Sequence, residues 1–447
     1  MTPSRVLTDP FSVRVLGIAP REFAAVAWSF VYFFCLLAAY YMLRSVRETM
    51  AIVSGVQNIP WLFTGTFTVM LAATPVFGWI ASRYRRRTFL PWVYYFFIAN
   101  ILLFFVAFNW FMEAAAARVW VARSFFVWLS VFNLFVVSVF WSFMADIWST
   151  DQSRRLFGII SAGGSTGAFL GPVITSVLVV PIGFENLLLL SAGLLVFSVY
   201  CTHRLRLWSL GQENVDEKSD AAASRPLGGS AFGGIKLVVT TPYLAAIAAS
   251  MVCAMFLGGA MYMYMADLVS LTFPDHDRQT RVFALIDAAS NAISFIGQLL
   301  IVRVAVQKFG IGMTLALLPL VSVIAFALLA ANPVFIVIAI FQVVRRGLAY
   351  GLTKPASDML YSVVSRESKY KAKNFIETAV WRGGDMVATW TIRSLAGIGL
   401  SGVALVCVPI AIVWSLLAFW IGRDYRRRDC TLTGSEYQDL EARNEQV

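Results

Sequence analysis

Three charged residues interrupt an apolar stretch near the N-terminus. Arg44 and Arg47 are three positions apart and share one helix face, and Glu48 lies four positions from Arg44, where the two can pair. One basic group is then left over. A guanidinium donates several hydrogen bonds to a phosphate or carboxylate, so this group can hold an anion. We expect Arg44, Arg47 and the adjacent Tyr41 to contact an anionic ligand, and Glu48 to act in gating or proton coupling.

A second polar stripe lies in a later apolar stretch. Tyr350, Lys354 and Asp358 recur every four residues, which aligns them on one helix face and lets the lysine pair with the aspartate. Arg345 and Arg346 precede them on the same predicted helix. The expected ligand contacts here are Arg345, Arg346, Tyr350 and Lys354. Asp358 is expected to act in gating or proton coupling.

Further polar side chains occur at similar depth in apolar stretches. The additional ligand contacts we expect are Asn133, a polar side chain in the interior, and Trp141 and Tyr264, whose rings can stack on a planar group. The additional gating or proton-coupling residues we expect are Asp146, Asp287, Glu377, Arg382 and Asp385. Internal pairing between helices, without any ligand contact, is the alternative for each of these charges.

The composition identifies the kind of protein that must position these side chains. Of the 447 residues, 59% are hydrophobic and 14% are charged, whereas charged residues make up about 25% of a soluble globular protein. The chain is therefore predicted to be a polytopic membrane protein. The five cysteines and two histidines have no metal-ligand spacing, so no metal and no cofactor is expected.

Apolar runs long enough to cross a bilayer, about 20 residues each, recur along the chain. The twelve predicted spans are 24–53, 60–81, 89–111, 122–146, 156–181, 187–206, 242–266, 282–303, 312–331, 334–362, 374–396 and 402–422. We expect an all-α protein with twelve transmembrane helices in a six-plus-six arrangement. The predicted domains are an N-terminal bundle (1–206), a linker (207–241), a C-terminal bundle (242–422) and a tail (423–447).

Most of the 36 lysines and arginines fall on the side of the membrane that this map assigns to both termini. Basic residues mark the cytoplasmic side of short loops, so both termini are predicted to be cytoplasmic. The net charge of +11 then reflects topology, and we expect no nucleic-acid partner. The basic residues left at membrane depth are Arg44, Arg47, Arg345, Arg346, Lys354 and Arg382.

Two motifs resemble those of the major facilitator superfamily. Residues 78–87 resemble its GxxxDRxGRR loop after the second span, with Ser82 and Arg85 in place of its Asp and second Gly. Residues 163–172 resemble its Gly-Pro antiporter motif in span five. A basic loop set by topology, or plain packing of small residues, would explain the same patterns. The resemblance implies a six-plus-six facilitator fold with a substrate site between the halves near the midplane.

A narrower resemblance is to the bacterial and plastid ATP/ADP translocases. The segment 350–385 is similar to theirs in its ordered Tyr, Pro, acid-Met-x-Tyr, Glu-Ser-Lys-x-Lys-x-Lys and Ile-acid elements. Residues 41–49 are similar to the Leu-Arg-x-x-Lys-Asp motif of that family, and Arg47 stands where a lysine contacts the nucleotide. Residues 140–145 resemble its Phe-Trp-x-Phe-Ala pattern. This resemblance implies nucleotide exchange across a bacterial inner (cytoplasmic) membrane.

The chain departs from the translocase pattern at three places. Asn133 stands where the family has a glutamate, Asp385 stands where a basic residue is expected, and predicted span seven (242–266) has no clearly placed acid. We therefore keep the substrate class broad: a secondary active transporter that moves an organic anion by alternating access, with a nucleotide or a phosphorylated metabolite as the leading candidate, and that works as a monomer in the lipid bilayer.

Two other functions remain open. A proton-coupled facilitator could use Glu377 or Asp385 to carry the proton and could move a siderophore, a peptide or a drug. A non-transporting receptor or membrane enzyme belongs to a different class. The sequence contains no Walker loop, HExxH or GxSxG motif, so it holds no catalytic residue set that we can identify.

Overall fold

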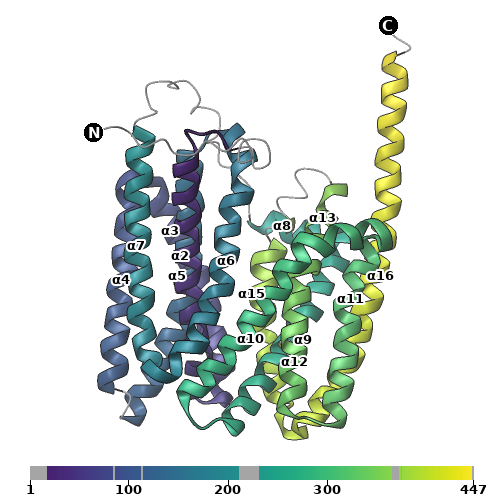
Figure 1. The fold of residues 1–447 in the computed structure, drawn as a ribbon. Coiled ribbons are helices and arrows are strands. Elements are labelled where there is room, and N and C mark those ends of the chain that lie inside the picture. The colour runs from purple at the N-terminus through teal and green to yellow at the C-terminus, as the bar shows by residue number, and fades with distance from the viewer. Residues whose placement is uncertain are drawn as a thin grey trace. The chain divides into compact units, whose positions relative to one another are not determined.

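The computed structural model describes residues 18–83, 86–111, 114–210, 231–364, 372–373 and 375–444, which are almost entirely helical (Figure 1). Three segments on which sequence predictions rest lie outside these residues. They are the middle of the predicted linker (211–230), part of the basic loop (84–85) and most of the lysine run (365–371).

The first half of the chain forms long helices at the predicted positions. They are α2 (Phe23–Val53), the short η1 (Val56–Asn58), α3 (Ile59–Arg83), α4 (Arg86–Phe111), α5 (Ala115–Ile147), α6 (Thr150–Ile182) and α7 (Phe184–Leu210). Each of the first six predicted spans falls within one long helix. α6 begins with a capping box, in which Ser149 and Gln152 each bond the other's backbone N–H.

The second half is helical but interrupted. Its elements are α8 (Ala231–Thr240), α9 (Pro242–Thr272), α10 (His276–Ile296), η2 (Gly297–Ile301), α11 (Val302–Ala331), α12 (Phe335–Leu348), η3 (Ala349–Thr353), α13 (Lys354–Met359), η4 (Leu360–Val363), η5 (Ile376–Val380), α15 (Trp381–Ser394), η6 (Ala396–Ile398) and α16 (Gly399–Asn444). The segments η2, η3 and η5 are π-helical turns, which occur often at functional sites.

The described residues contain nine helical segments long and apolar enough to cross a membrane. One of them, His276–Ala331, runs through both predicted spans 282–303 and 312–331. The break between these spans lies at Gly310, whose φ of 77° is readily reached without a side chain. The multi-pass, all-helical prediction is therefore confirmed, and the count of twelve crossings stays a prediction.

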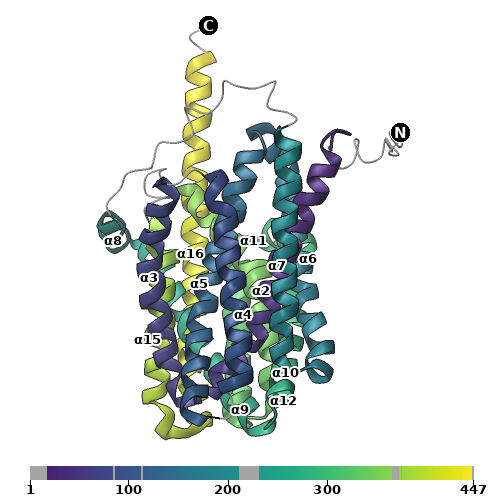
Figure 2. The same ribbon diagram turned by 90° about the vertical axis from the view of Figure 1, so that its left-hand side faces the viewer.

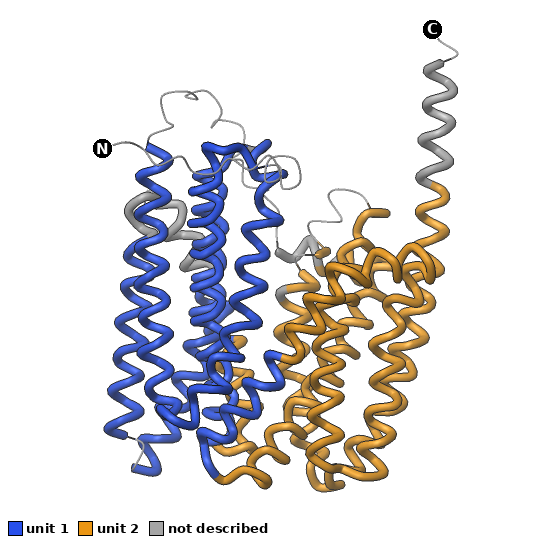
Figure 3. Tube along the Cα trace, in the orientation of Figure 1, with its two compact units in different colours: residues 1–54, 68–225, 275–288 blue, residues 55–67, 226–274, 289–447 orange. Residues whose placement is uncertain are grey.

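The chain divides into two compact units (Figure 3). Unit 1 comprises residues 1–54, 68–225 and 275–288, and unit 2 comprises residues 55–67, 226–274 and 289–447. Each unit thus takes one short segment from the other half of the sequence. The start of α10 packs within unit 1, and the start of α3 packs within unit 2. The predicted domain limits stay a prediction.

Helix α2 is the centre of unit 1 and packs against α5, α6 and α7 (Figure 2). Its contact with α6 depends on three glycines spaced four residues apart. A Cβ at Gly163 or Gly167 would overlap the carbonyl oxygen of Phe30 or Phe34, and one at Gly171 would lie 2.7 Å from the Ala38 oxygen. The small residues in the Gly-Pro motif therefore allow two backbones to meet.

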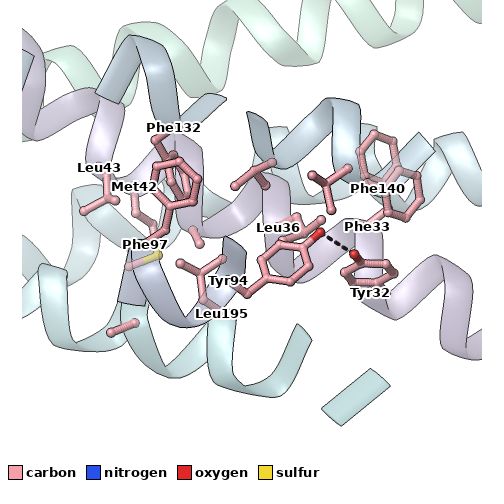
Figure 4. Close-up of a cluster of buried hydrophobic side chains, with 14 of the residues drawn as sticks. Tyr32, Phe33, Leu36, Met42, Leu43, Tyr94, Phe97, Phe132, Phe140 and Leu195 are labelled. Carbon is pink, nitrogen blue, oxygen red and sulfur yellow. Dashed lines mark hydrogen bonds between the residues drawn. The ribbon is translucent and has the colours of Figure 1, made fainter. Parts of the chain in front are cut away.

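Aromatic side chains fill the core of unit 1 (Figure 4). Phe33 on α2 stacks on Phe140 of α5 with ring centroids 4.0 Å apart. Tyr32 and Tyr94 are fully buried and hydrogen-bond each other through their hydroxyls. The two hydroxyls satisfy each other where no water is available.

In unit 2, α11 packs along α16, and α9 packs against α15 and α16. The α11–α16 contact is close at Gly312 and Gly422, where a Cβ on Gly422 would overlap the Gly312 backbone. Trp414 on α16 donates its indole N–H to Ser250 on α9 at 2.8 Å. Glycine contacts and buried polar bonds therefore hold unit 2 together, as they do unit 1.

The close α2–α6 contact predicts that one methyl group added at this contact lowers the stability of the protein. Gly167→Ala forces the added Cβ into the Phe34 carbonyl, so we expect it to destabilise the protein by about 1–3 kcal/mol. Gly158→Ala on the same helix meets nothing within 4 Å and is the matched control. Thermal unfolding of the two purified variants in detergent measures the difference. Equal melting temperatures would contradict this packing.

Candidate functional site

The charged residues of α2 form a compact cluster in unit 1. Arg47 donates from Nη2 to Glu48 Oε1 at 2.7 Å, and Arg44 Nε lies 4.0 Å from the same oxygen. Arg44 Nε also lies 3.7 Å from Asp287 Oδ2 on α10. The sequence pairs Glu48 with Arg44 and leaves Arg47 over, but in the structure Glu48 is closer to Arg47. Arg44 also faces a carboxylate from a helix more than 200 positions away in the chain. Two arginines and two acids make the cluster neutral.

Burial makes this cluster costly to break. Asp287 is 1% exposed and Glu48 is 7% exposed. Removing one member of a buried pair leaves an uncompensated charge, which typically costs about 3–5 kcal/mol. Next to the cluster, the hydroxyls of Thr49 and Thr280 hydrogen-bond at 2.7 Å, so α2 and the start of α10 meet at two places.

Aromatic rings surround the two arginines. The Arg47 guanidinium lies 4.6 Å from the centre of the Phe126 ring, and that of Arg44 lies 5.4 Å from the centre of the Tyr41 ring. Both distances allow cation–π attraction. Tyr41 therefore lies beside Arg44, and its contact with a ligand stays a prediction. Asn133 is half-buried on α5, and no hydrogen bond joins it to another described residue.

A second cluster, in unit 2, joins α13 to η5 and to Lys373 just before it. Lys354 Nζ lies 2.5 Å from Glu377 Oε1 and 3.2 Å from Asp358 Oδ1. Lys373 Nζ lies 2.7 Å from Asp358 Oδ1 and 4.0 Å from Glu377 Oε1. Each lysine is thus shared by both acids. All four side chains are about one-third exposed, so water reaches the cluster.

The π-helical turn η3 follows from the proline that comes after Lys354. The Lys354 N–H donates to the Ala349 carbonyl, five residues back, and Pro355 has no N–H to offer. The Tyr350 carbonyl therefore has no backbone donor. It accepts from Gln298 Nε2 at 3.0 Å instead. A side chain from the neighbouring η2 thus satisfies a group that the hydrocarbon could not.

Close helix packing makes this replacement possible. A Cβ at Gly351 would lie 3.2 Å from the Ser294 backbone, and one at Gly297 would lie 3.1 Å from Gly351 Cα. Ser294 also donates its hydroxyl to the Gly347 carbonyl at 3.3 Å. The kinked α12–η3–α13 segment is therefore fixed against α10 and η2, which sets the direction of the Lys354 side chain.

A pair of arginines lies one to two helical turns before this kink. Arg345 is partly buried and donates from Nε and Nη2 to Gln342 Oε1 at 3.4 and 3.2 Å. It forms no ion pair with any residue in the described part of the chain. Arg346 is its charged neighbour, and Asp385 acts on Arg345 by charge alone. Among the basic residues of the two clusters and this pair, Arg345 is therefore the one whose charge is least neutralised.

The other candidates are spread over the fold. Trp141 packs among Phe33, Phe140 and Phe157, within an aromatic cluster. Tyr264 is 2% exposed and donates its hydroxyl to the Leu400 carbonyl. Asp146 is exposed near the end of α5.

Arg382 on α15 makes no ion pair with another described residue.

Sequence reasoning did not single out Gln342, and it placed Lys373 in a loop. The glutamine lies three residues before Arg345, a spacing that could have indicated it.

The Arg44–Asp287 pair predicts non-additive mutations. Arg44→Gln removes the guanidinium that faces the buried Asp287 carboxylate, so we expect a loss of about 3 kcal/mol in stability. The double variant Arg44→Gln, Asp287→Asn removes both charges. It should lose less than the sum of the single variants by about 1 kcal/mol or more. Thermal unfolding measures all four proteins, and strictly additive losses would show that the two side chains do not interact.

Comparison with known proteins places this arrangement in a family. Residues 23–372 match the model of the Major Facilitator Superfamily, which is well over half of the chain. No curated protein matches the sequence.

Several solved structures share the fold. The nucleoside transporter NupG is 16% identical with a TM-score of 0.60, over 90% of this chain and 98% of its own. A bacterial homologue of the iron transporter ferroportin is 11% identical with a TM-score of 0.63, over 90% and 98%. A POT family transporter is 11% identical with a TM-score of 0.61, over 91% and 99%.

These likenesses agree with the helical architecture, and at such low identity they concern the fold alone. The family model covers both arginine-bearing helices, α2 and α12, together with the close α2–α6 contact. The chain belongs to the major facilitator superfamily and is a multi-pass membrane transporter.

Proposed function

We propose that this transporter moves an organic anion by alternating access and that Arg345 supplies its main electrostatic contact. The observation that carries the proposal is the environment of this guanidinium. It is partly buried at membrane depth, and its hydrogen-bond partner is the neutral amide of Gln342. A charge in such a place is usually paired or functional. A phosphate or carboxylate would provide the missing negative charge.

The balance of charge also favours unit 2. The interior cluster of unit 1 is neutral. In unit 2 the polar tract contains five basic and three acidic residues, an excess of two positive charges. The basic residues are Arg345, Arg346, Lys354, Lys373 and Arg382, and the acidic ones are Asp358, Glu377 and Asp385. An excess of this sign attracts an anion with more than one negative charge.

We further propose a nucleotide, or a related phosphorylated metabolite, as the substrate that is exchanged. Support comes from the resemblance of segments 41–49 and 350–385 to the ATP/ADP translocases. Tyr350, which is 43% exposed and lies one turn from Arg346, could stack on a base. One of the structural neighbours is described as a nucleoside transporter.

The roles of the other charges follow from their partners. Glu48 and Asp287 already hold Arg44 and Arg47, and Asp358 and Glu377 already hold Lys354. We assign these groups to gating or proton coupling, since a pair can separate when the helices move. Two six-helix bundles, cytoplasmic termini, an inner-membrane location and a monomeric state complete the proposal.

Proton coupling is the second candidate, because the Lys354–Glu377 contact offers a mechanism. Protonation of Glu377 would remove half of the negative charge that holds Lys354 and Lys373. The lysines would then be available to an anion or free to move. In this version the facilitator would accumulate its solute at the expense of a proton gradient.

The anion proposal predicts a transport defect in Arg345→Gln. A hydrogen bond to a charged group is worth about 1.5–3 kcal/mol, so we expect roughly 10- to 100-fold weaker binding of the transported anion. The measurement is counterflow of labelled ATP, ADP and other phosphate esters into liposomes that hold the same unlabelled compound. Arg303→Gln, an exposed arginine in the same unit, removes the same charge and should transport normally. Wild-type transport by Arg345→Gln would refute this role for Arg345, and no binding across the panel would refute the nucleotide version.

Proton coupling predicts a different pattern for Glu377→Gln. If Glu377 carries the proton, this variant should retain exchange of internal for external substrate and lose accumulation against a gradient. An uncoupler should abolish accumulation by the wild type in the same way. Uptake of labelled substrate into liposomes, with and without an imposed pH gradient, separates the two. Exchange without any response to the gradient or the uncoupler would exclude proton coupling.

A further inference from the structure

A groove of about 340 Å³ lies between α4 and α7 in unit 1. The two helices run side by side in both views of the fold (Figures 1 and 2). The residues that matter to the argument are Tyr95 from α4 and Val196, Val199, Tyr200, His203 and Arg206 from α7. None of them belongs to the charged clusters described above.

The surroundings of the groove are those of a surface that faces lipid. Tyr95 and Tyr200 are 53% and 46% exposed. Trp92 and Phe96, which flank Tyr95 in the sequence, are exposed to a similar or greater extent. Large apolar side chains exposed together on a transmembrane helix indicate contact with acyl chains.

The groove changes from apolar to basic along α7. Val196 and Val199 line one part, and His203 and Arg206 line the part nearer the end of the helix at Leu210. Ten residues of helix separate Val196 from Arg206, or about 15 Å, which is half of a hydrocarbon core about 30 Å thick. This spacing equals the thickness of one leaflet, so a lipid whose acyl chain lies along the two valines would have its headgroup at His203 and Arg206.

We propose that this groove binds a phospholipid with an anionic headgroup. Arg206 and His203 would contact the phosphate, and the tyrosine hydroxyls can donate further hydrogen bonds. The two valines and the tyrosine rings would contact an acyl chain. A free phosphate would fill the basic end and leave the apolar half unused, so the lipid is the better match. This proposal does not depend on the identity of the transported substrate.

The sequence before the apolar part of α4 agrees with an anionic lipid. It has four arginines, at positions 83, 85, 86 and 87. If the positive side of the chain is cytoplasmic, as the sequence predicts, the groove opens to the leaflet surface where anionic lipids concentrate basic segments.

Lipid in this groove would stabilise unit 1. α7 packs against α2, and Tyr94, next to Tyr95, hydrogen-bonds Tyr32 of α2. A lipid that fills the α4–α7 seam therefore supports the helix that carries Arg44 and Arg47. Arg206 also lies 5.9 Å from the centre of the Phe143 ring, so a purely structural role for it must be tested separately.

The test compares two lipids that differ only in their headgroup. Full-length protein is delipidated in detergent and titrated with phosphatidylglycerol or with phosphatidylcholine of the same acyl chains. Bound lipid is counted by native mass spectrometry, and stability is followed by thermal unfolding. We expect phosphatidylglycerol to bind and to raise the melting temperature, and we expect phosphatidylcholine to do neither. Glycerol phosphate and inorganic phosphate at equal concentration should have no effect.

Variants locate the site. Arg206→Gln should weaken phosphatidylglycerol binding about tenfold, the effect of losing one charged hydrogen bond. His203→Ala, at an exposed position, should weaken it measurably even if Arg206→Gln fails to fold. Arg204→Gln removes a charge nearby but outside the lining of the groove and is the control.

If Arg204→Gln weakened phosphatidylglycerol binding as much as Arg206→Gln, the binding would depend on general surface charge, and the proposal would be overturned. Equal binding of phosphatidylcholine, or an equal response to free phosphate, would overturn it as well.

Discussion

Hydrocarbon offers no hydrogen-bond partner and no screening of charge, and every polar group in the spans of this transporter must respond to that constraint. The Tyr350 carbonyl shows the response on the smallest scale. Pro355 removes a donor, the helix widens into a π turn, and Gln298 from a neighbouring helix donates in its place. The kink is tolerated because Gly297 and Gly351 let the two backbones approach.

The same constraint sorts the buried charges. Arg44, Arg47 and Lys354 have carboxylates within 4 Å, and the Arg44–Asp287 and Lys354–Glu377 pairs each join two different helical segments. Arg345 differs, because its hydrogen-bond partner is a neutral amide. Ion pairs whose charges cancel can hold helices together or release them. A guanidinium whose charge is not cancelled can bind an anionic ligand. For this reason the substrate site that we propose centres on Arg345 rather than on Lys354.

Each unit includes a short segment from the other half of the sequence, and contacts with these segments help to hold each unit together. The start of α10 belongs to unit 1, where Asp287 and Thr280 contact α2. The start of α3 belongs to unit 2, where Thr64 accepts the indole N–H of Trp390 at 3.0 Å. Each unit is thus held in part by residues from the other half of the chain. A conformational change must either break these contacts or move the short segments together with the unit that they contact.

The sequence alone determined the class of protein, the helix positions in the first half and the list of charged candidates. The length and composition of an apolar run are local properties of the sequence, and they decide whether a segment can cross the bilayer. Only the tertiary structure decided which charges are neutralised. Asp287 reaches Arg44 across more than 200 residues, and Lys373 joins Asp358 from what the sequence suggests is a loop. The break of span ten into helical and π-helical pieces also depends on Gln298, a side chain from another helix. Such pairings depend on packing in three dimensions, which hydrophobic periodicity along one helix cannot specify.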